Sequence, residues 1–132
     1  MADYEFPDEL RYSNEDEWAR AEGNLVTLGI TDYAQQQLGD IVFVELPEPG
    51  STLRKGEPFG VVESVKVVSD LFAPVSGQVS AVNEDLADNP ETVNEDCYGR
   101  GWLLVVKTSD PSELRALLDA AAYREHVDER SD

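Results

Sequence analysis

Short apolar runs separated by turn residues predict a mainly β chain. Five runs have this composition: residues 24–30, 41–46, 59–72, 78–83 and 102–107. Between the first two runs, Thr31 or Asp32 is placed to cap a short helix that continues through Gln37 and ends at Gly39. The pattern therefore predicts a small sandwich or barrel of roughly six or seven strands, with short helices attached.

The run from Phe59 to Phe72 must fold back on itself. It is about fourteen residues long, whereas strands average roughly five or six. Glu63–Lys66 is the polar interruption of the run before Ser69, so we expect the chain to reverse there. This reversal places Lys66, which valines flank on both sides, at the tip of a β-hairpin.

The two ends of the chain carry different signals. Asp110–Glu113 combines a capping aspartate, a proline at the first helical position and an early glutamate. Four apolar residues then follow at helical spacing: Leu114, Leu117, Leu118 and Ala121. We therefore expect one C-terminal helix over about 111–127, with a frayed polar tail from Asp128. The charge-rich N-terminal stretch offers Tyr12 and Trp18 as anchors to a core.

Length and charge restrict the class of protein. The chain has 132 residues, 41% of them hydrophobic, so we expect one compact domain over residues 1–132. Ten basic and 28 acidic residues give a net charge of −18, which argues against nucleic acid and membrane as partners. The sequence contains no run near the ~18 apolar residues of a membrane span, and its acidic start is unlike a signal peptide. We therefore expect a cytoplasmic protein.

The acidic composition is also poor in lysine. Lys55, Lys66 and Lys107 are the three lysines of the chain, whereas arginine occurs seven times. Concentrated salt screens the self-repulsion of such a surface, so the composition indicates a halophilic prokaryote, with an ordinary acidic protein as the alternative. In a chain with so little lysine, each lysine that is present needs an explanation.

The residue types give no sign of a catalytic centre. The single histidine, His126, lies close to the C-terminal tail, and the single cysteine, Cys97, stands beside carboxylates that disfavour a thiolate. The sequence contains neither a metal-ligand spacing nor a glycine-rich phosphate loop. We therefore expect a protein without catalytic residues and without a bound metal.

Lys66 is the candidate functional residue. A lysine held on a rigid hairpin tip presents a primary amine to other proteins, and an amine can form an amide with a carboxylic acid cofactor. The alternative is a surface lysine that forms an ion pair with Glu63 or Asp70.

The residues around Lys66 resemble a known attachment motif. Val62–Lys66, followed by Ser69–Asp70 and Ala73–Gly77, is similar to the lipoylation signature of the H-protein family of the glycine cleavage system. Further similar segments occur in the family's order and spacing, from about Tyr12 to Tyr123: Glu17–Trp18, Gly29–Thr31, Leu38–Asp40, Val42–Pro47, Asn94–Asp96 and Tyr98–Trp102. Biotin carriers resemble Met-Lys-Met at this tip, and lipoyl domains of 2-oxoacid dehydrogenases typically have Asp-Lys-Ala, so both differ from the tip of this chain.

The resemblance implies a fold, a cofactor and a set of partners. The fold is the barrel-sandwich hybrid of lipoyl and biotinyl carriers, with two small antiparallel sheets, short helices, a lipoyl-like core over about 24–108 and a C-terminal helix. The cofactor is lipoic acid, joined to Lys66 through an amide by a lipoylating enzyme. The carrier takes the aminomethyl group of glycine from the P protein, a pyridoxal-phosphate glycine decarboxylase, to the T protein, an aminomethyltransferase. The L protein, a dihydrolipoyl dehydrogenase, reoxidises it, so the chain is a carrier and not an enzyme.

Several residues bear on how the family's pattern applies to this chain. Glu17 matches a family glutamate and is our candidate for meeting the amine in the cleft that receives the loaded arm; one more solvated carboxylate is the alternative. Val67 and Val68 stand where alanine is commonest, which bears on recognition by the lipoylating enzyme. Cys97 stands in place of a usual proline, and Asp16 in place of a usual histidine beside the cleft.

Two other functions are compatible with the sequence. One is a carrier that relays lipoyl groups to other enzymes, which the H-protein family can also do. The other is an interaction protein whose Lys66 is never modified. The intact mass of protein purified from its own cells separates the unmodified protein from both carriers.

Overall fold

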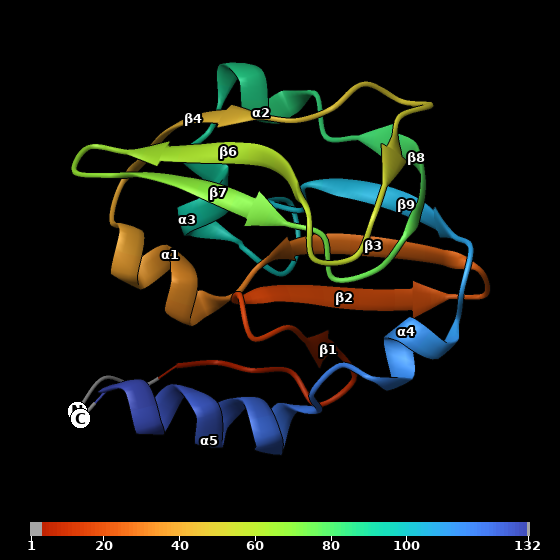
Figure 1. The fold of residues 1–132 in the computed structure, drawn as a ribbon. Helices are drawn as coiled ribbons and strands as arrows, with labels where there is room; N and C mark the ends of the chain where they lie inside the picture. The colour runs from red at the N-terminus through yellow and green to blue at the C-terminus, as the bar shows by residue number, and fades with distance from the viewer. Residues whose placement is uncertain (1–3, 132) are drawn as a thin grey trace.

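The chain folds as two β-sheets with short helices (Figure 1), and the computed structural model describes residues 4–131. The strands in this range are β1 (Arg11–Tyr12), β2 (Glu17–Glu22), β3 (Leu25–Ile30), β4 (Ile41–Glu45), β5 (Thr52–Leu53), β6 (Pro58–Ser64), β7 (Val68–Phe72), β8 (Gly77–Val82) and β9 (Leu104–Thr108). The helices in this range are α1 (Asp32–Leu38), α2 (Asp85–Asp88), α3 (Thr92–Glu95), α4 (Ser112–Arg115) and α5 (Ala120–Ser131). The predicted mainly β fold of two antiparallel sheets, short helices and a C-terminal helix is confirmed.

The two sheets pack around a shared core. Within the described residues, one sheet has the strand order β1-β2-β3-β9-β8-β5 and the other has the order β4-β6-β7. Val26 pairs with Val106 and Leu28 with Leu104 across β3 and β9, and all four side chains are fully buried. Because burying one valine or leucine contributes about 1.5–3 kcal/mol, this strand pair is a major source of stability.

Trp18 depends on a glycine on the neighbouring strand. Trp18 of β2 lies directly opposite Gly29 of β3, and its fully buried ring occupies the space where a β-carbon at position 29 would stand. The indole N–H of Trp18 donates to the carbonyl oxygen of Cys97 at 3.0 Å. A side chain at position 29 would therefore displace the largest residue of the core.

The prediction of one continuous C-terminal helix is wrong, because the segment forms two helices, α4 and α5. The helix is interrupted between α4 and α5 because Leu118 forms an antiparallel bridge with Tyr12, with N–H to carbonyl bonds of 2.8 Å in both directions. Asp119 then starts α5, since its side chain accepts a hydrogen bond from the Ala122 amide at 2.8 Å. The predicted fraying from Asp128 is also wrong, because α5 continues through Ser131.

An aromatic cluster joins α5 to the N-terminal segment, and Figure 1 shows this helix along the outside of β1. The rings of Tyr12 and Tyr123 stack at a centroid distance of 4.8 Å, and the ring of Phe6 meets Tyr123 edge-on at 4.9 Å. The expected anchoring of the N-terminal stretch through Tyr12 and Trp18 is confirmed, since both side chains are fully buried. None of the helices in residues 4–131 has both the length and the apolar character needed to cross a membrane.

Candidate functional site

Ser64 organises the turn that carries Lys66. The turn joins β6 to β7, and its backbone closes through a 2.8 Å bond from the Ser64 amide to the Val67 carbonyl oxygen. The Ser64 hydroxyl oxygen accepts further bonds from the amides of Lys66 and Val67, at 3.3 and 3.2 Å. The Val65 amide donates to the carbonyl oxygen of Asp40 at 3.0 Å. The backbone on both sides of Lys66 is therefore held in place, although the turn has no Asn-Gly or Asp-Gly pair.

The Lys66 side chain is exposed, and its amine forms no ion pair with the described residues. Lys66 forms no ion pair with Glu63, with Asp70 or with any other acidic residue between positions 4 and 131. The Cε atom of Lys66 lies beside Gly39 at the end of α1, where an added β-carbon would stand 3.5 Å from it. The predicted location of Lys66 at a hairpin tip is confirmed, and the alternative ion pair is absent from this part of the chain.

Apolar side chains surround Lys66 at the surface. Val65, Val67 and Val68 are exposed, and Val65 and Val68 expose 70% and 67% of their surface. Phe43 of β4 is also exposed and shares an outward-facing row with Val68, because both residues pair with Glu63 of β6. The tip thus presents an amine beside exposed valines, with Glu63 between Phe43 and Val68 in the outward-facing row.

Glu17 is buried, so the alternative of a solvated carboxylate is wrong. Its side chain is 2% exposed. One carboxylate oxygen accepts a bond from the Ser13 hydroxyl at 2.6 Å, and the other accepts a bond from the Phe72 amide at 3.1 Å. Because Phe72 is the last residue of β7, the strand that follows Lys66 also holds Glu17.

Burial changes the acidity of Glu17. The pKa of this carboxyl is raised from its ordinary 4.5 to about 8, mainly by loss of solvation and to a smaller extent by the charges of Asp16 and Glu15. The bonds from Ser13 and Phe72 act in the opposite direction, because they favour the ionised form. At neutral pH the carboxyl is therefore largely protonated, and a cation placed beside it would favour its ionised form.

A cleft of about 130 Å³ lies at the foot of the hairpin and has several acidic lining residues. Four carboxylates line it: Glu15 and Asp16 of the turn before β2, Glu17 at the start of β2, and Asp70 of β7. Apolar side chains line the rest of the cleft, among them Ile30 of β3 and Leu38 of α1. A second cavity of about 300 Å³ opens on the other side of Glu17. The chemistry of the first cleft suits a small aliphatic group that ends in an amine.

Cys97 and His126 lie outside the lining of this cleft. Cys97 is buried, and burial together with nearby carboxylates raises the pKa of its thiol to about 12, so it stays protonated. The imidazole of His126 lies 3.3 Å from the Asn14 carbonyl oxygen. Sequence reasoning missed the Phe72 amide, because no local pattern shows which backbone group meets a side chain 55 positions away.

Comparison with known proteins assigns the chain to a family. The family model described as "Glycine cleavage H-protein" matches residues 10–130. This chain belongs to the glycine cleavage H-protein family. The glycine cleavage system H protein of Anaeromyxobacter sp. (strain K) is 58% identical over 126 residues, which cover 96% of this chain and 98% of that protein. The H protein of Anoxybacillus flavithermus is 59% identical over 123 residues, which cover 93% and 97% of the two chains.

A solved structure agrees with this assignment. The crystal structure of a glycine cleavage system H protein from Mycobacterium marinum superposes with a TM-score of 0.84 at 41% sequence identity. The match covers 96% of this chain and 100% of that chain. The resemblance that the Lys66 motif indicated is therefore confirmed at the level of the family and of the fold. Members of this family carry lipoate and act with the P, T and L proteins.

Proposed function

We propose that this chain is a lipoyl carrier of the glycine cleavage system and that lipoate is attached to Lys66. Membership of the H-protein family supports the carrier role. The observation that carries the assignment to Lys66 is its exposed amine, free of ion pairs with residues 4–131, on a turn that Ser64 holds in place. Lys55 and Lys107 are also exposed, but the family motif surrounds neither of them.

The residues present fit such a cofactor. An attached lipoyl group supplies a disulfide that can be opened to receive the aminomethyl group of glycine and later reformed by oxidation. The chain itself fixes the backbone at Lys66 and leaves space beside the lysine stem at Gly39. It also provides an acidic cleft next to the end of α1, with Glu17 and Asp70 on its wall.

Glu17 has a defined part in this proposal. Its carboxyl is largely protonated when the cleft holds no cation, because burial raises its pKa to about 8. A primary ammonium group in the cleft would favour the ionised carboxylate, so the amine and Glu17 would stabilise each other's charges. Ser13 and Phe72 keep both carboxylate oxygens in place for this contact. The chain thereby shields an amine from water and contributes no catalytic residue of its own.

The exposed valines make the surface of the tip a candidate recognition surface for the lipoylating enzyme. A lipoylating enzyme must recognise the unmodified hairpin, and the P, T and L proteins must accept the modified one. Val65, Val67 and Val68 offer the only apolar contacts next to the amine within the described turn. We expect the lipoylating enzyme to bind these valines, and we expect the turn that Ser64 holds to place Lys66 for modification.

Replacement of single lysines tests this function. Lys66→Arg keeps the positive charge, and the exposed tip should tolerate it within about 0.5 kcal/mol, but a guanidinium cannot take the lipoyl amide. Lys107→Arg is the matched control, because Lys107 is exposed on β9. Each variant is coexpressed with a lipoylating enzyme, its intact mass is measured, and the protein is then added to the P, T and L proteins.

The two variants should behave differently. We expect Lys107→Arg to be lipoylated and to support glycine cleavage, and Lys66→Arg to melt like the parent, to keep its unmodified mass and to support no cleavage. Lipoate on another lysine, or full activity of an unmodified Lys66→Arg protein, would refute the proposal. A parent protein that remains unmodified beside an active lipoylating enzyme would identify an interaction protein instead.

A further inference from the structure

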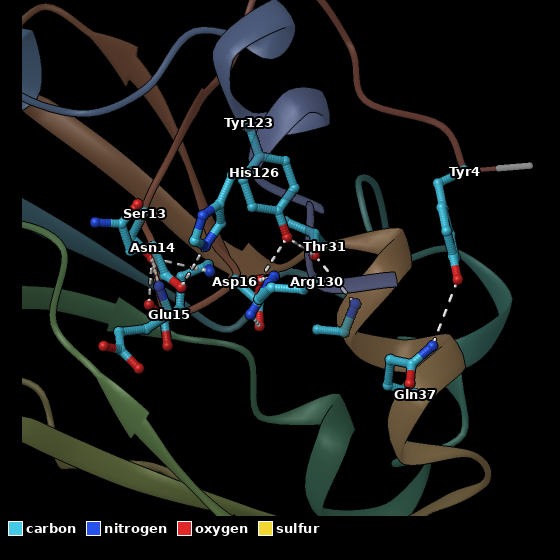
Figure 2. Close-up of polar contacts among 12 residues, drawn as sticks. Tyr4, Ser13, Asn14, Glu15, Asp16, Thr31, Gln37, Tyr123, His126 and Arg130 are labelled. Atoms are coloured by element: carbon cyan, nitrogen blue, oxygen red, sulfur yellow. Dashed lines mark hydrogen bonds and ion pairs between the residues drawn. The ribbon is translucent and has the colours of Figure 1, made fainter. Parts of the chain in front are cut away.

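A polar network around Asp16 attaches α5 to the turn that precedes β2 (Figure 2). The Tyr123 hydroxyl donates to one carboxylate oxygen of Asp16 at 2.8 Å. The guanidinium of Arg130 contacts both oxygens of the same carboxylate, donating to the second at 3.2 Å. An arginine that engages a carboxylate through two nitrogens fixes orientation as well as charge. The first and the last turns of α5 are therefore joined to a single side chain of this turn.

The backbone of Asp16 is unusual and tightly held. Its φ angle is +72°, and Asp16 is the one residue other than glycine with a positive φ among residues 4–131. Aspartate and asparagine tolerate this left-handed conformation better than most residues do. The Asp16 amide donates to the Ser13 carbonyl oxygen at 3.2 Å, and the Asp16 carbonyl oxygen accepts from the Thr31 amide at 3.0 Å. Glu17 follows directly, so the backbone conformation of Asp16 determines the position of the Glu17 backbone.

The network continues from α5 into α1. The hydroxyl oxygens of Tyr123 and Thr31 are 2.8 Å apart, and the Thr31 hydroxyl oxygen caps α1 by accepting the Ala34 amide at 3.1 Å. Burial raises the pKa of the Tyr123 phenol far above its ordinary value, so the phenol stays protonated and donates to Asp16. Thr31 therefore donates to Tyr123. Arg130 also lies over the ring of Tyr33 on α1, 4.9 Å from its centroid.

Both connected elements are walls of the acidic cleft. Asp16 lines it from the turn and Glu17 from the start of β2, whereas Ala34, Gln37 and Leu38 line it from α1. The two walls are distant in sequence from α5, yet Tyr123 and Arg130 contact both of them. A substitution of Tyr123 or Arg130 would therefore alter the walls of the cleft, although neither residue lines it.

We propose that Arg130 and Tyr123 are positioning residues that hold the turn and α1 together as two of the walls of the cleft and neutralise Asp16 beside Glu17. This inference rests on the proposed function, because the proposed function makes the cleft the binding site of the amine. It assigns to the C-terminal helix a part in the binding site, although α5 contributes no side chain to the cleft lining within residues 4–131. It also explains why an aspartate at position 16 fits this chain.

The charges near Glu17 predict the direction in which each substitution shifts its pKa, which packing alone does not. The charged groups around Glu17 are Asp16 and Glu15, which directly precede it, Asp70 in the lining of the first cleft and Lys55 in the lining of the second cavity. Removing Arg130 leaves the charge of Asp16 uncompensated, which raises the pKa of Glu17. Removing the charge of Asp16 lowers that pKa. Both changes weaken the same network, so their effects on stability have one sign and their effects on Glu17 have opposite signs.

The experiment follows the Glu17 carboxyl by carbon-13 NMR through a pH titration of the full, unlipoylated chain. We expect Arg130→Gln to shift the titration of Glu17 upward and Asp16→Asn to shift it downward, because asparagine tolerates the positive φ but carries no charge. Arg124→Gln is the control, since it removes the same charge from α5 at a residue that contacts Phe6 and Tyr4 instead of Asp16. It should leave the titration unchanged.

Tyr123→Phe tests the mechanical link without changing charge. It keeps the ring in the aromatic cluster and removes the hydroxyl between Thr31 and Asp16. We expect hydrogen exchange of the Ala34 amide to become about tenfold faster or more, because the cap of α1 loses its support. Unchanged exchange at Ala34, or shifts of Glu17 in the same direction in Arg130→Gln and Asp16→Asn, would overturn the inference.

These measurements are separable from the proposed function. They need no cofactor, so a protein that is never lipoylated can still show both opposite shifts. In turn, Arg130→Gln should be lipoylated at Lys66 as fully as the parent, because Lys66 lies outside the network. Loss of lipoylation in the parent would refute the carrier proposal alone, whereas equal titration of Glu17 in Arg130→Gln and Arg124→Gln would refute the positioning role alone.

Discussion

Replacing Glu17 with glutamine should remove a large part of the pH dependence of stability. In the folded chain the pKa of Glu17 is raised to about 8, against an ordinary value of 4.5 that applies to the unfolded chain. Between these values the folded state binds one more proton than the unfolded state does. The free energy of unfolding therefore contains a contribution from Glu17 that is complete below about pH 4.5 and is lost as the pH rises through about 8.

The size of this contribution follows from the interval between the two pKa values. At about 1.4 kcal/mol per pH unit, the full interval corresponds to at most about 5 kcal/mol. Relaxation and water entry reduce the cost of burying a charge, so we expect about 2–5 kcal/mol. Glu17→Gln is neutral at every pH and lacks this slope. The variant should thus gain stability relative to the parent as the pH rises, whatever constant offset its altered bonds to Ser13 and Phe72 introduce.

Urea unfolding at constant ionic strength measures the effect. Both proteins are unfolded at several pH values between about 5 and 9, with the fluorescence of buried Trp18 as the signal. The other carboxylates are common to both proteins, so the difference in the free energy of unfolding isolates Glu17. A difference that stays constant across this range would show that Glu17 is already ionised in the folded chain at pH 6 and would refute the account of its burial.

Three further changes test other parts of the structure. Gly29→Ala should cost about 3 kcal/mol in urea unfolding, because its β-carbon would overlap the Trp18 ring; a cost below 1 kcal/mol would contradict this packing. Ser64→Ala should cost about 1 kcal/mol and slow lipoylation of Lys66, measured by mass over time, and an unchanged rate would remove Ser64 from recognition. The melting temperature should rise as potassium chloride is added, because salt screens a net charge of −18, and a flat melting temperature would contradict the halophilic interpretation.

The sequence was most informative where the signals are local. Thr31 and Gly39 bound α1 because a hydroxyl cap and a glycine act on the nearest few residues. The hairpin was predictable because its apolar run exceeds the length of a strand. The reversal falls at Val65–Val67, which overlaps the predicted Glu63–Lys66, although Glu63 and Ser64 still belong to β6. The location of Lys66 follows from the same run.

Long-range contacts account for what the sequence did not show. β2 was not predicted because its sequence, EWARAE, mixes charge with few apolar residues, and Trp18 is buried only through its fit to Gly29 on the next strand. The interruption before α5 depends on Leu118 meeting Tyr12 across the fold. Among 28 acidic residues, no local pattern distinguishes the buried Glu17 from solvated carboxylates. Its burial depends on β7, whose Phe72 amide donates to its carboxylate.

The hairpin unites the two parts of the site. β7 begins just after Lys66, contributes Asp70 to the acidic cleft and ends at Phe72, whose amide holds Glu17. A single strand therefore connects the attachment point with the carboxylate that would meet an amine. Because β7 pairs along its length with β6, the tip cannot move far without changing the pairing that fixes the Phe72 amide. Rigidity at the tip and the position of the buried Glu17 carboxyl are thus two consequences of the same pairing.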